Sequence, residues 1–427
     1  MNRRSLLTSA AAGAAGLALA PRFAAFAQST PQAVNADLTG KVTYWTTYNT
    51  VSPEYKVLSE QVIPAFNAVY PNVEIDAQQI PDSDMRQKLL TAAAGGETPD
   101  VARMDIVQTP EFANLDALAA MEDLIPDFAT YSQMFYPGPL ATNSFQGKHY
   151  GLPLDTNTRV VFYNLALFEE AGIAAAPTTF DEFSAAVDAI MALGKDGVAA
   201  FSEGGTGSWN VLPWFWSNGG GITNADYTQA TGVLNSEATV GAVNLLKGWL
   251  DSGAMSQTIL GGGLSTSQEL AENNAAIIVD GPWMPAVFAA QYPDFKYGLA
   301  TFPAGPGGSI SVVGGENIVL FEASKNKEAA LAFAQFVSTP APQLAMASTG
   351  QMPVLTELTT STDVPDYFAT FLTQLQTAQP RTPSPAWPKI DEAIGNAVLL
   401  ALTGEQDAQS ALDDAAAAVD ELLAQYK

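Results

Sequence analysis

The sequence predicts an α/β fold built on parallel strands, and three consecutive stretches near the start of the chain carry that prediction. Residues 41–47 (KVTYWTT) alternate in polarity and are rich in β-forming side chains, which is typical of a strand. Residues 54–70 repeat apolar side chains every fourth position, as one face of a helix does. Residues 73–75 resume an alternating strand. The order strand, helix, strand predicts a βαβ unit and hence a parallel sheet.

Further elements follow the same scheme along the chain. Residues 84–94 form an amphipathic pattern that ends at Gly95-Gly96, and residues 99–105 read as a buried strand with a charged carboxyl end. In open α/β sheets that end of a strand is where ligands bind. Thr179 followed by Glu182 is a capping box, which predicts a helix start there.

Composition bounds both the size of the fold and the class of partner. The chain has 427 residues, of which 47% are hydrophobic and 15% charged, enough for two domains with cores. Acids outnumber bases 44 to 18, so the net charge of −26 repels nucleic acid and anionic lipid. We therefore expect no nucleic-acid partner.

The residue types that many catalytic and metal sites need are scarce. The sequence has no cysteine and one histidine, His149, in a turn between apolar runs. This excludes disulfides, thiolate nucleophiles and Cys–metal sites. No Gly-rich stretch completes a nucleotide-binding motif, and no acid cluster has EF-hand spacing. We expect no cofactor, no metal and no catalytic residue.

The first 27 residues are predicted to be an export signal peptide. Arg3-Arg4 precedes a mildly apolar run to Ala20, and Ala25-Phe26-Ala27 supplies small residues for cleavage. Twin arginines favour Tat export over Sec export, which would look similar. With no cysteine at the cleavage point and no later apolar window long enough to span a bilayer, we expect a periplasmic protein without a lipid anchor.

Residues 277–321 hold two clusters in which an acid stands beside glycine: Asp280-Gly281-Pro282-Trp283 and Gly314-Gly315-Glu316-Asn317. Each follows or enters an apolar β-type run, so we interpret them as two walls of one ligand cleft, contributed by two lobes. A carboxylate pair could hydrolyse a glycosidic bond. Carboxylates beside tryptophan also bind sugars, because they accept hydrogen bonds from hydroxyls while the ring stacks on a pyranose face. We favour binding over cleavage.

Residues 201–222 are rich in Gly, Ser and Trp. We expect at least one of Trp209, Trp214 and Trp216 to pack in the core. The interspersed glycines favour a cleft wall with exposed rings for the other tryptophans, but they do not indicate which of the three line the cleft.

Taken in order, these motifs resemble the extracellular solute-binding proteins of carbohydrate ABC transporters, the family that includes maltose- and trehalose-binding proteins. The matching blocks cover nearly the whole mature chain and are Phe66-Asn67-x-x-Tyr70-Pro71-Asn72-Val73, Ala94-Gly95-Gly96-x-x-Pro99-Asp100-Val101, Gly151-Leu152-Pro153-Leu154-Asp155-Thr156-x-Thr158-Arg159, Tyr163-Asn164-x-x-Leu167-Phe168, Ala171-Gly172-Ile173, Pro177-Thr178-Thr179, Asp280-Gly281-Pro282-Trp283, Gly314-Gly315-Glu316-Asn317, residues 325–330, and Pro380-Arg381 to Trp387.

The resemblance implies a two-lobed periplasmic-binding-protein fold of type II, each lobe a mainly parallel sheet flanked by helices. The first lobe would comprise residues 28–152 and 301–352, and the second residues 155–300 and 354–427. Three hinge crossings would lie near 153–155, 301–303 and 352–354, and ligand binding would close the lobes about them.

Matched residue by residue, the resemblance also implies a binding site. Asp105, Arg103, Glu316 and the Gly315 backbone would contact sugar hydroxyls from the first lobe, and Trp283 would stack on the ligand. The remaining members are Asp155 and Thr156 at the hinge, Arg381 from the second lobe, Asp280, which could instead only cap a turn, and the looser matches Trp45, Trp214 and Trp216.

The function implied is capture of a mono- or oligosaccharide in the periplasm, by a monomer, for delivery to an ABC permease with its cytoplasmic ATPase. Two alternatives stay open at this point. One is an exported glycosidase with a carboxylate pair. The other is a binding protein for a polyamine, which would suit the acids, or for a glycerol phosphodiester, which would demand more basic side chains. The identity of the sugar is not predicted.

Overall fold

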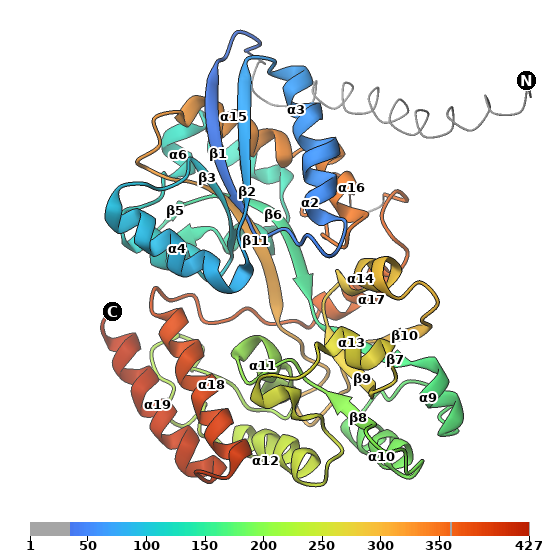
Figure 1. The fold of residues 1–427 in the computed structure, drawn as a ribbon. Helices are drawn as coiled ribbons and strands as arrows, with labels where there is room; N and C mark the ends of the chain where they lie inside the picture. Colours follow the sequence, from blue (N-terminus) through green and yellow to red (C-terminus); the bar gives the residue numbers. More distant parts are fainter. Residues whose placement is uncertain (1–34, 359–360, 427) are drawn as a thin grey trace, which may run out of the picture. The chain divides into compact units, whose positions relative to one another are not determined.

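A computed structural model describes residues 35–358 and 361–426, and the predicted signal peptide lies outside them. The described residues form two compact units (Figure 1). Unit 1 comprises residues 35–105, 115–155 and 316–364, and unit 2 comprises residues 106–114, 156–315 and 365–426. Each unit is therefore built from discontinuous sequence.

Unit 1 is organised around a five-stranded mixed sheet. Its strand order is β2 (Val73–Gln79), β1 (Gly40–Thr46), β3 (Val101–Asp105), β11 (Val313–Leu320), β6 (Leu152–Thr158). Strand β1 runs parallel to both β2 and β3, whereas β11 runs antiparallel to β3 and sets Glu316 opposite Asp105. Two acids from distant parts of the chain thus become cross-strand neighbours.

The helices of unit 1 supply the rest of its core. They are α2 (Glu54–Val57), η2 (Leu58–Val62), α3 (Ile63–Val69), α4 (Asp82–Gly95), α6 (Met121–Leu124), α7 (Phe128–Tyr131), η3 (Ser132–Met134), α8 (Pro137–Ala141), α15 (Lys327–Val337), α16 (Pro340–Ala347) and η5 (Thr356–Leu358), with the hairpin β4 (Ser144–Phe145) and β5 (Lys148–His149). Phe66 of α3 packs edge-on against Phe333 and Phe336 of α15, at centroid distances of 5.3 and 5.5 Å.

Unit 2 has a four-stranded sheet in the order β10 (Tyr297–Ala300), β7 (Val160–Asn164), β9 (Ala275–Asp280), β8 (Ala199–Ser202). Only the β8–β9 pairing among these is parallel; β7 is antiparallel to both β9 and β10. This sheet is therefore more mixed than the mainly parallel arrangement expected from the resemblance.

Helices cover this sheet and bury a large aromatic core. They are α5 (Thr109–Asn114), α9 (Leu165–Glu170), α10 (Phe180–Met191), α11 (Ser208–Ser217), α12 (Glu237–Asp251), η4 (Gln257–Leu260), α13 (Thr266–Ala271), α14 (Met284–Gln291), α17 (Phe368–Leu375), α18 (Trp387–Thr403) and α19 (Ala408–Ala424). Helices α18 and α19 lie side by side as the C-terminal pair (Figure 1).

The predicted βαβ start and the predicted helix caps are confirmed. Gly96 ends α4 in the left-handed conformation at φ 71°. The Thr179 side chain accepts a hydrogen bond from the Glu182 N–H at 3.2 Å. Glu182 reaches back to the N–H of Thr178, one residue before the position that a standard capping box uses.

The helix predicted over residues 54–70 is interrupted by a π-helical turn, η2. There the N–H of Ile63 donates to the carbonyl of Leu58, five residues earlier. The turn lies directly before Pro64, which has no N–H to continue the regular ladder. Single π turns of this kind are frequent at functional sites.

The division into units differs in detail from the expected lobes. Residues 301–315 belong to unit 2, so the chain enters unit 1 at Glu316, and residues 353–358 belong to unit 1. The expected hinge crossings stay predictions.

Candidate functional site

Unit 1 gathers carboxyl groups around one buried guanidinium. We call this group the unit 1 acid cluster, and its members are Glu54 at the start of α2, Arg103 and Asp105 on β3, Asp155 on β6, Glu316 on β11, and Gln351 in the segment after α16. Of the sequence-predicted residues, Arg103, Asp105, Asp155 and Glu316 are thus brought together.

Arg103 holds the acid cluster together. Its Nη2 lies 2.7 Å from Glu316 Oε2 and donates to Asp155 Oδ2 at 3.3 Å and to Gln351 Oε1 at 3.0 Å. Its Nη1 donates to the Thr47 hydroxyl. The guanidinium also lies over the ring of Tyr48, 4.5 Å from its centroid. Five groups from four separate segments therefore fix one side chain.

Several polar atoms of the cluster have no hydrogen-bond partner. They are Asp155 Oδ1, Arg103 Nε and Glu316 Oε2, the last of which is close to Arg103 without the alignment of a hydrogen bond. Asp155 is 3% exposed, and buried polar atoms are rarely left without a partner. Asp155 Oδ1 can accept a hydrogen bond from a donor-rich ligand, and Glu316 Oε2, which is paired with Arg103, has no aligned donor.

Burial shifts the protonation equilibria of the cluster. Burial raises the pKa of Glu316 well above its ordinary value. The neighbouring Asp155 and Asp105 add to this shift, and Arg103 opposes it. Burial also raises the pKa of Glu54. Burial alone would lower the pKa of Arg103, but Glu316 and Asp155 outweigh it and raise that pKa. Arg103 is thus permanently charged, while Glu316 readily holds a proton.

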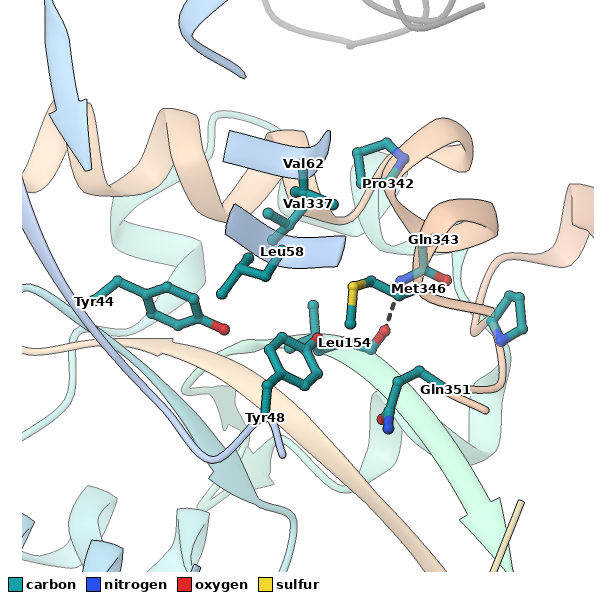
Figure 2. Close-up of a pocket in the computed structure, with 11 residues that line it drawn as sticks. Tyr44, Tyr48, Leu58, Val62, Leu154, Val337, Pro342, Gln343, Met346 and Gln351 are labelled. Carbon is teal, nitrogen blue, oxygen red and sulfur yellow. Dashed lines mark hydrogen bonds between the residues drawn. The ribbon is translucent and has the colours of Figure 1, made fainter. Parts of the chain in front are cut away.

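A small cavity lies next to the acid cluster (Figure 2). Its volume is 10 Å³, room for about one water molecule. The lining residues are Tyr44, Tyr48, Leu58, Val62, Leu154, Val337, Pro342, Gln343, Met346, Gln351 and Pro353. Burial raises the pKa of Tyr44 to about 12, so its hydroxyl stays protonated. This cavity is too small for a sugar and serves as the packed support of the cluster.

Unit 2 carries an aromatic wall made of Trp209 on α11 and Trp283 directly before α14. The two rings are stacked, with centroids 6.2 Å apart and an interplanar angle of 29°, and both side chains are half-buried. The Arg381 guanidinium lies 5.7 Å from the Trp209 centroid. Stacked indole faces with an adjacent cation suit the C–H face and hydroxyl rim of a pyranose.

A buried arginine, Arg159, holds the aromatic wall in place. It pairs with Glu203 at 2.5 Å and donates to the carbonyls of Trp209 at 3.2 Å and Asn210 at 2.9 Å. It also donates to the carbonyl of Val279, at the end of β9. Burial raises the pKa of Glu203, although Arg159 opposes that shift. Arg159, directly before β7, thereby joins the end of β8 to α11 and β9.

Asp280 is engaged within its own turn. Its Oδ1 accepts from the Gly281 N–H at 2.7 Å, and its Oδ2 accepts from the Thr266 hydroxyl at 3.2 Å. Burial, opposed by Arg159, raises the pKa of Asp280. This geometry corresponds to the turn-capping role that the sequence left open.

The other predicted contacts lie in three different environments. Trp214 is fully buried among rings that include Phe183 and Phe302, and Trp216 is 6% exposed. Trp45 has Lys88 over its ring at 4.5 Å. The remaining two are Thr156, whose hydroxyl donates to the Gly314 carbonyl at 3.3 Å, and Gly315, whose carbonyl accepts from the Ile106 N–H at 3.1 Å.

Sequence reasoning missed Glu54, Gln351 and Tyr48, and left Trp209 undecided. Glu54 and Gln351 meet through a 3.2 Å hydrogen bond although they lie near opposite ends of the chain. No motif joins them, so no local signal could have paired them. For Trp209, the signal was its place at the N-terminal end of α11 beside glycines, whereas Trp214 lies inside the helix.

Other features of the described chain do not add to the site. A hollow of 420 Å³ in unit 2, lined by residues such as Asn164, Tyr292 and Lys296, includes none of the predicted residues. No cluster of acidic or histidine side chains suited to a metal ion occurs among residues 35–358 and 361–426. Over the same ranges, no helix has the length and apolar character needed to cross a bilayer.

His149 lies in the short strand β5, where its Nδ1 is 2.8 Å from Glu122 Oε1. Burial tends to raise the pKa of Glu122, but hydrogen bonds from the His149 side chain and backbone outweigh it and lower that pKa. The histidine contacts Glu122 and Phe128, which belong to neither site cluster, so it has a local structural role.

A family model for bacterial extracellular solute-binding proteins matches residues 49–344. The chain belongs to this family. As a solute-binding protein it is a transport component and not an enzyme, so the alternative of an exported glycosidase is not favoured.

Relatives and solved structures agree with that membership. A putative binding protein of Brucella abortus is 27% identical over 375 residues, 85% of this chain and 89% of the relative. A maltooligosaccharide ABC transporter solute-binding lipoprotein of Streptococcus pneumoniae is 27% identical over 289 residues, covering 65% and 67%. The GacH receptor of Streptomyces glaucescens, solved unliganded and with acarbose, superposes with a TM-score of 0.83 at 25% identity, covering 91% of this chain and all of that one.

Proposed function

We propose that this solute-binding protein is the substrate-binding component of an ABC importer and captures a mono- or oligosaccharide for delivery to a membrane permease. Relatives support the transporter assignment, since one is named as a maltooligosaccharide ABC transporter component. Solved structures 25% identical to this chain were obtained with acarbose and with α-D-tagatose. The ligand would accordingly be a carbohydrate.

The observation that carries the proposal is that each unit, considered by itself, offers a chemistry that a sugar needs. Unit 1 offers the carboxylate oxygens Asp155 Oδ1 and Glu316 Oε2, which have no hydrogen-bond donor and would accept from hydroxyl groups. Charge-assisted hydrogen bonds of this kind are among the stronger ones in proteins. Unit 2 offers the stacked rings of Trp209 and Trp283, which would cover the C–H face of a pyranose.

We propose a core set of ligand contacts and a second set of weaker support. The core set is Arg103, Asp155, Glu316, Trp209, Trp283 and Arg381, and the second set is Asp105, Thr156, Gly315 and Trp45. We leave out Trp214 and Trp216, because both rings pack in the core of unit 2. We also leave out Asp280, because both of its oxygens already accept hydrogen bonds.

Export and partners follow from the sequence and the family together. We infer that residues 1–27 direct export, by the Tat route in view of Arg3-Arg4, and that the mature protein is a monomer free in the periplasm. The S. pneumoniae relative is named a lipoprotein, whereas this chain has no cysteine to carry a lipid. Its partners would be the permease subunits and their ATPase.

A thermal-shift screen tests the ligand class, because a ligand that binds only the folded state raises the melting temperature. We expect at least one mono- or oligosaccharide to raise it, and polyols, polyamines and glycerol phosphodiesters to leave it unchanged. Trp283→Ala should abolish the shift without unfolding the protein, since the ring is half-buried. Trp249→Phe, a substitution within the aromatic core of unit 2, is the matched control that should keep it. A shift with a polyamine or phosphodiester alone would refute the proposal.

A further inference from the structure

Building on the proposed saccharide-binding function, we propose that the unit 1 acid cluster is a subsite for a protonated amino group, so that the preferred ligand is an amino-bearing saccharide and not a neutral one. The subsite would be formed by Asp155 and Glu316, with Asp105 beside them. The amino group would supply the hydrogen-bond donors that the carboxylate oxygens of the cluster lack.

The first reason is the charge balance of the cluster. It contains the carboxyl groups of Glu54, Asp155 and Glu316 against the single guanidinium of Arg103. A bound ligand removes water from such a group, and buried carboxylates without a counter-charge are costly. With a neutral sugar the cluster would depend on a bound proton for this compensation, whereas an ammonium group would supply the positive charge itself.

The second reason is the geometry of the free acceptors. Asp155 Oδ1 and Glu316 Oε2 both lack a hydrogen-bond donor, and Asp155 is 97% shielded from solvent, since only 3% of it is exposed. Arg103 Nη2 contacts Asp155 Oδ2 at 3.3 Å and Glu316 Oε2 at 2.7 Å, so the two side chains lie close together while Asp155 Oδ1 has no donor. A sugar hydroxyl offers one donor hydrogen, while an ammonium group offers three. An ammonium beside Arg103 would therefore donate to Asp155 Oδ1 and keep further hydrogens for Glu316.

The third reason is that the carboxyl groups of Asp155 and Glu316 lie close enough together to favour a bound positive charge between them. The side chains of Glu316 and Asp155 are close enough to share a proton by hydrogen bonding, and this contact helps to raise the pKa of Glu316. The groups around them are Arg103 and Asp105 from β3, Glu54 from α2, Gln351, and the tyrosines Tyr44 and Tyr48, whose pKa values are raised by burial. An ammonium would take the place of the shared proton.

A metal ion is a poorer occupant than an organic cation. Among the described residues no three acidic or histidine side chains are arranged to hold a metal. Arg103, fixed between the carboxylates, also occupies the position that a metal would need. An ammonium, which is held by hydrogen bonds at longer distances, is compatible with that arginine.

The test compares saccharides with and without an amino group, by calorimetric titration of the mature protein at about pH 6, where primary sugar amines are protonated. One set is cellobiose, chitobiose and N,N′-diacetylchitobiose, in which a hydroxyl is replaced by an amine and then by a neutral amide. The other is maltotetraose and acarbose, which carries a secondary amine. We expect the amine of at least one set to bind at least ~10-fold more tightly than its neutral counterparts.

Two variants and one control identify the subsite. Asp155→Asn and Glu316→Gln keep the side-chain shape and remove one negative charge, so each should abolish the preference for the amine. Affinity for the neutral saccharide should change less than affinity for the amine. Asp123→Asn removes the same charge from an exposed side chain of unit 1 and should keep the full preference.

A second measurement distinguishes charge from shape. If the ammonium replaces the shared proton, its binding releases a proton, and the measured enthalpy depends on the ionisation enthalpy of the buffer. Binding of the neutral saccharide should release none. Comparable affinity for amine and neutral members of both sets would overturn the subsite and leave saccharide binding intact. Absence of binding by every saccharide, with or without binding of a polyamine, would overturn the proposed function itself and the subsite with it.

Discussion

At the residue scale, two buried arginines account for most of the organisation of both site clusters. Arg103 fixes Asp155, Glu316 and Gln351 in unit 1, and Arg159 fixes Glu203 and the backbone beneath Trp209 in unit 2. The family resemblance implied Arg103 as a contact, through its match to the family's binding position. It did not predict the role of Arg159, because a buried arginine can be recognised only once its partners are brought together in the fold.

The raised pKa of Glu316 yields a prediction about stability and pH. A carboxyl group with a folded-state pKa above its ordinary value near 4.5 favours the folded protein when protonated. That contribution is complete below pH 4.5 and is lost as the pH rises through the folded-state pKa. We therefore expect Glu316→Gln to melt higher than the wild type at neutral pH, with the difference vanishing on acidification. A variant that is less stable at every pH would contradict this account and make the ion pair with Arg103 the dominant effect.

The Arg159–Glu203 pair gives a second residue-scale prediction. Removing one partner of a buried ion pair leaves an uncompensated charge, which costs about 3–5 kcal/mol. Arg159→Met should lower the free energy of unfolding by that amount in a urea titration, and Glu203→Gln added to it should recover part of the loss. Lys195→Met breaks an exposed pair with Glu170 in the same unit and should cost at most about 1 kcal/mol. Equal losses of unfolding free energy in Arg159→Met and Lys195→Met would show that the buried pair contributes no more than the exposed one.

At the scale of elements, local sequence predicted strands and helices better than it predicted their pairing. The strand at residues 101–105 and the helix starting after Thr179 follow from polarity pattern and capping chemistry. The antiparallel pairing of β11 with β3, which sets Glu316 opposite Asp105, does not follow from either strand alone. The π turn before Pro64 and the mixed sheet of unit 2 also depend on tertiary packing and were not predicted.

A glycine on β11 connects strand geometry to the aromatic wall. A Cβ added at Gly314 would lie 2.1 Å from Asn157 Oδ1 and 2.7 Å from the Trp209 ring. We expect Gly314→Ala to displace Trp209 and to weaken saccharide binding at least ~10-fold, about 1.4 kcal/mol. Gly248→Ala is the matched control: it lies on helix α12 with nothing within 4 Å, so it should keep affinity and stabilise the helix by up to about 1 kcal/mol. Unchanged affinity in Gly314→Ala, measured by intrinsic fluorescence titration, would remove Trp209 from the proposed contacts.

At the scale of the whole molecule, the α/β class and the family could be predicted from the sequence, because ordered motifs extend over nearly the whole mature chain. The site could be predicted in part. Acids and tryptophans beside glycine were identified, but exposure was not: Trp209 and Trp214 lie about 1.4 turns apart on one helix, and only packing makes Trp214 a core residue. The identity of the sugar depends on positions of atoms that residue types alone do not specify.

The central claim is that this solute-binding protein captures a carbohydrate without altering it. The most direct test is a calorimetric titration of the mature protein with the saccharide that gives the largest thermal shift, followed by chromatography of the recovered ligand. We expect one saccharide per chain, binding weakened at least ~10-fold in Trp283→Ala, and recovery of the intact sugar. A shorter or rearranged sugar in the recovered fraction, or heat of binding only with a non-carbohydrate solute, would contradict the account.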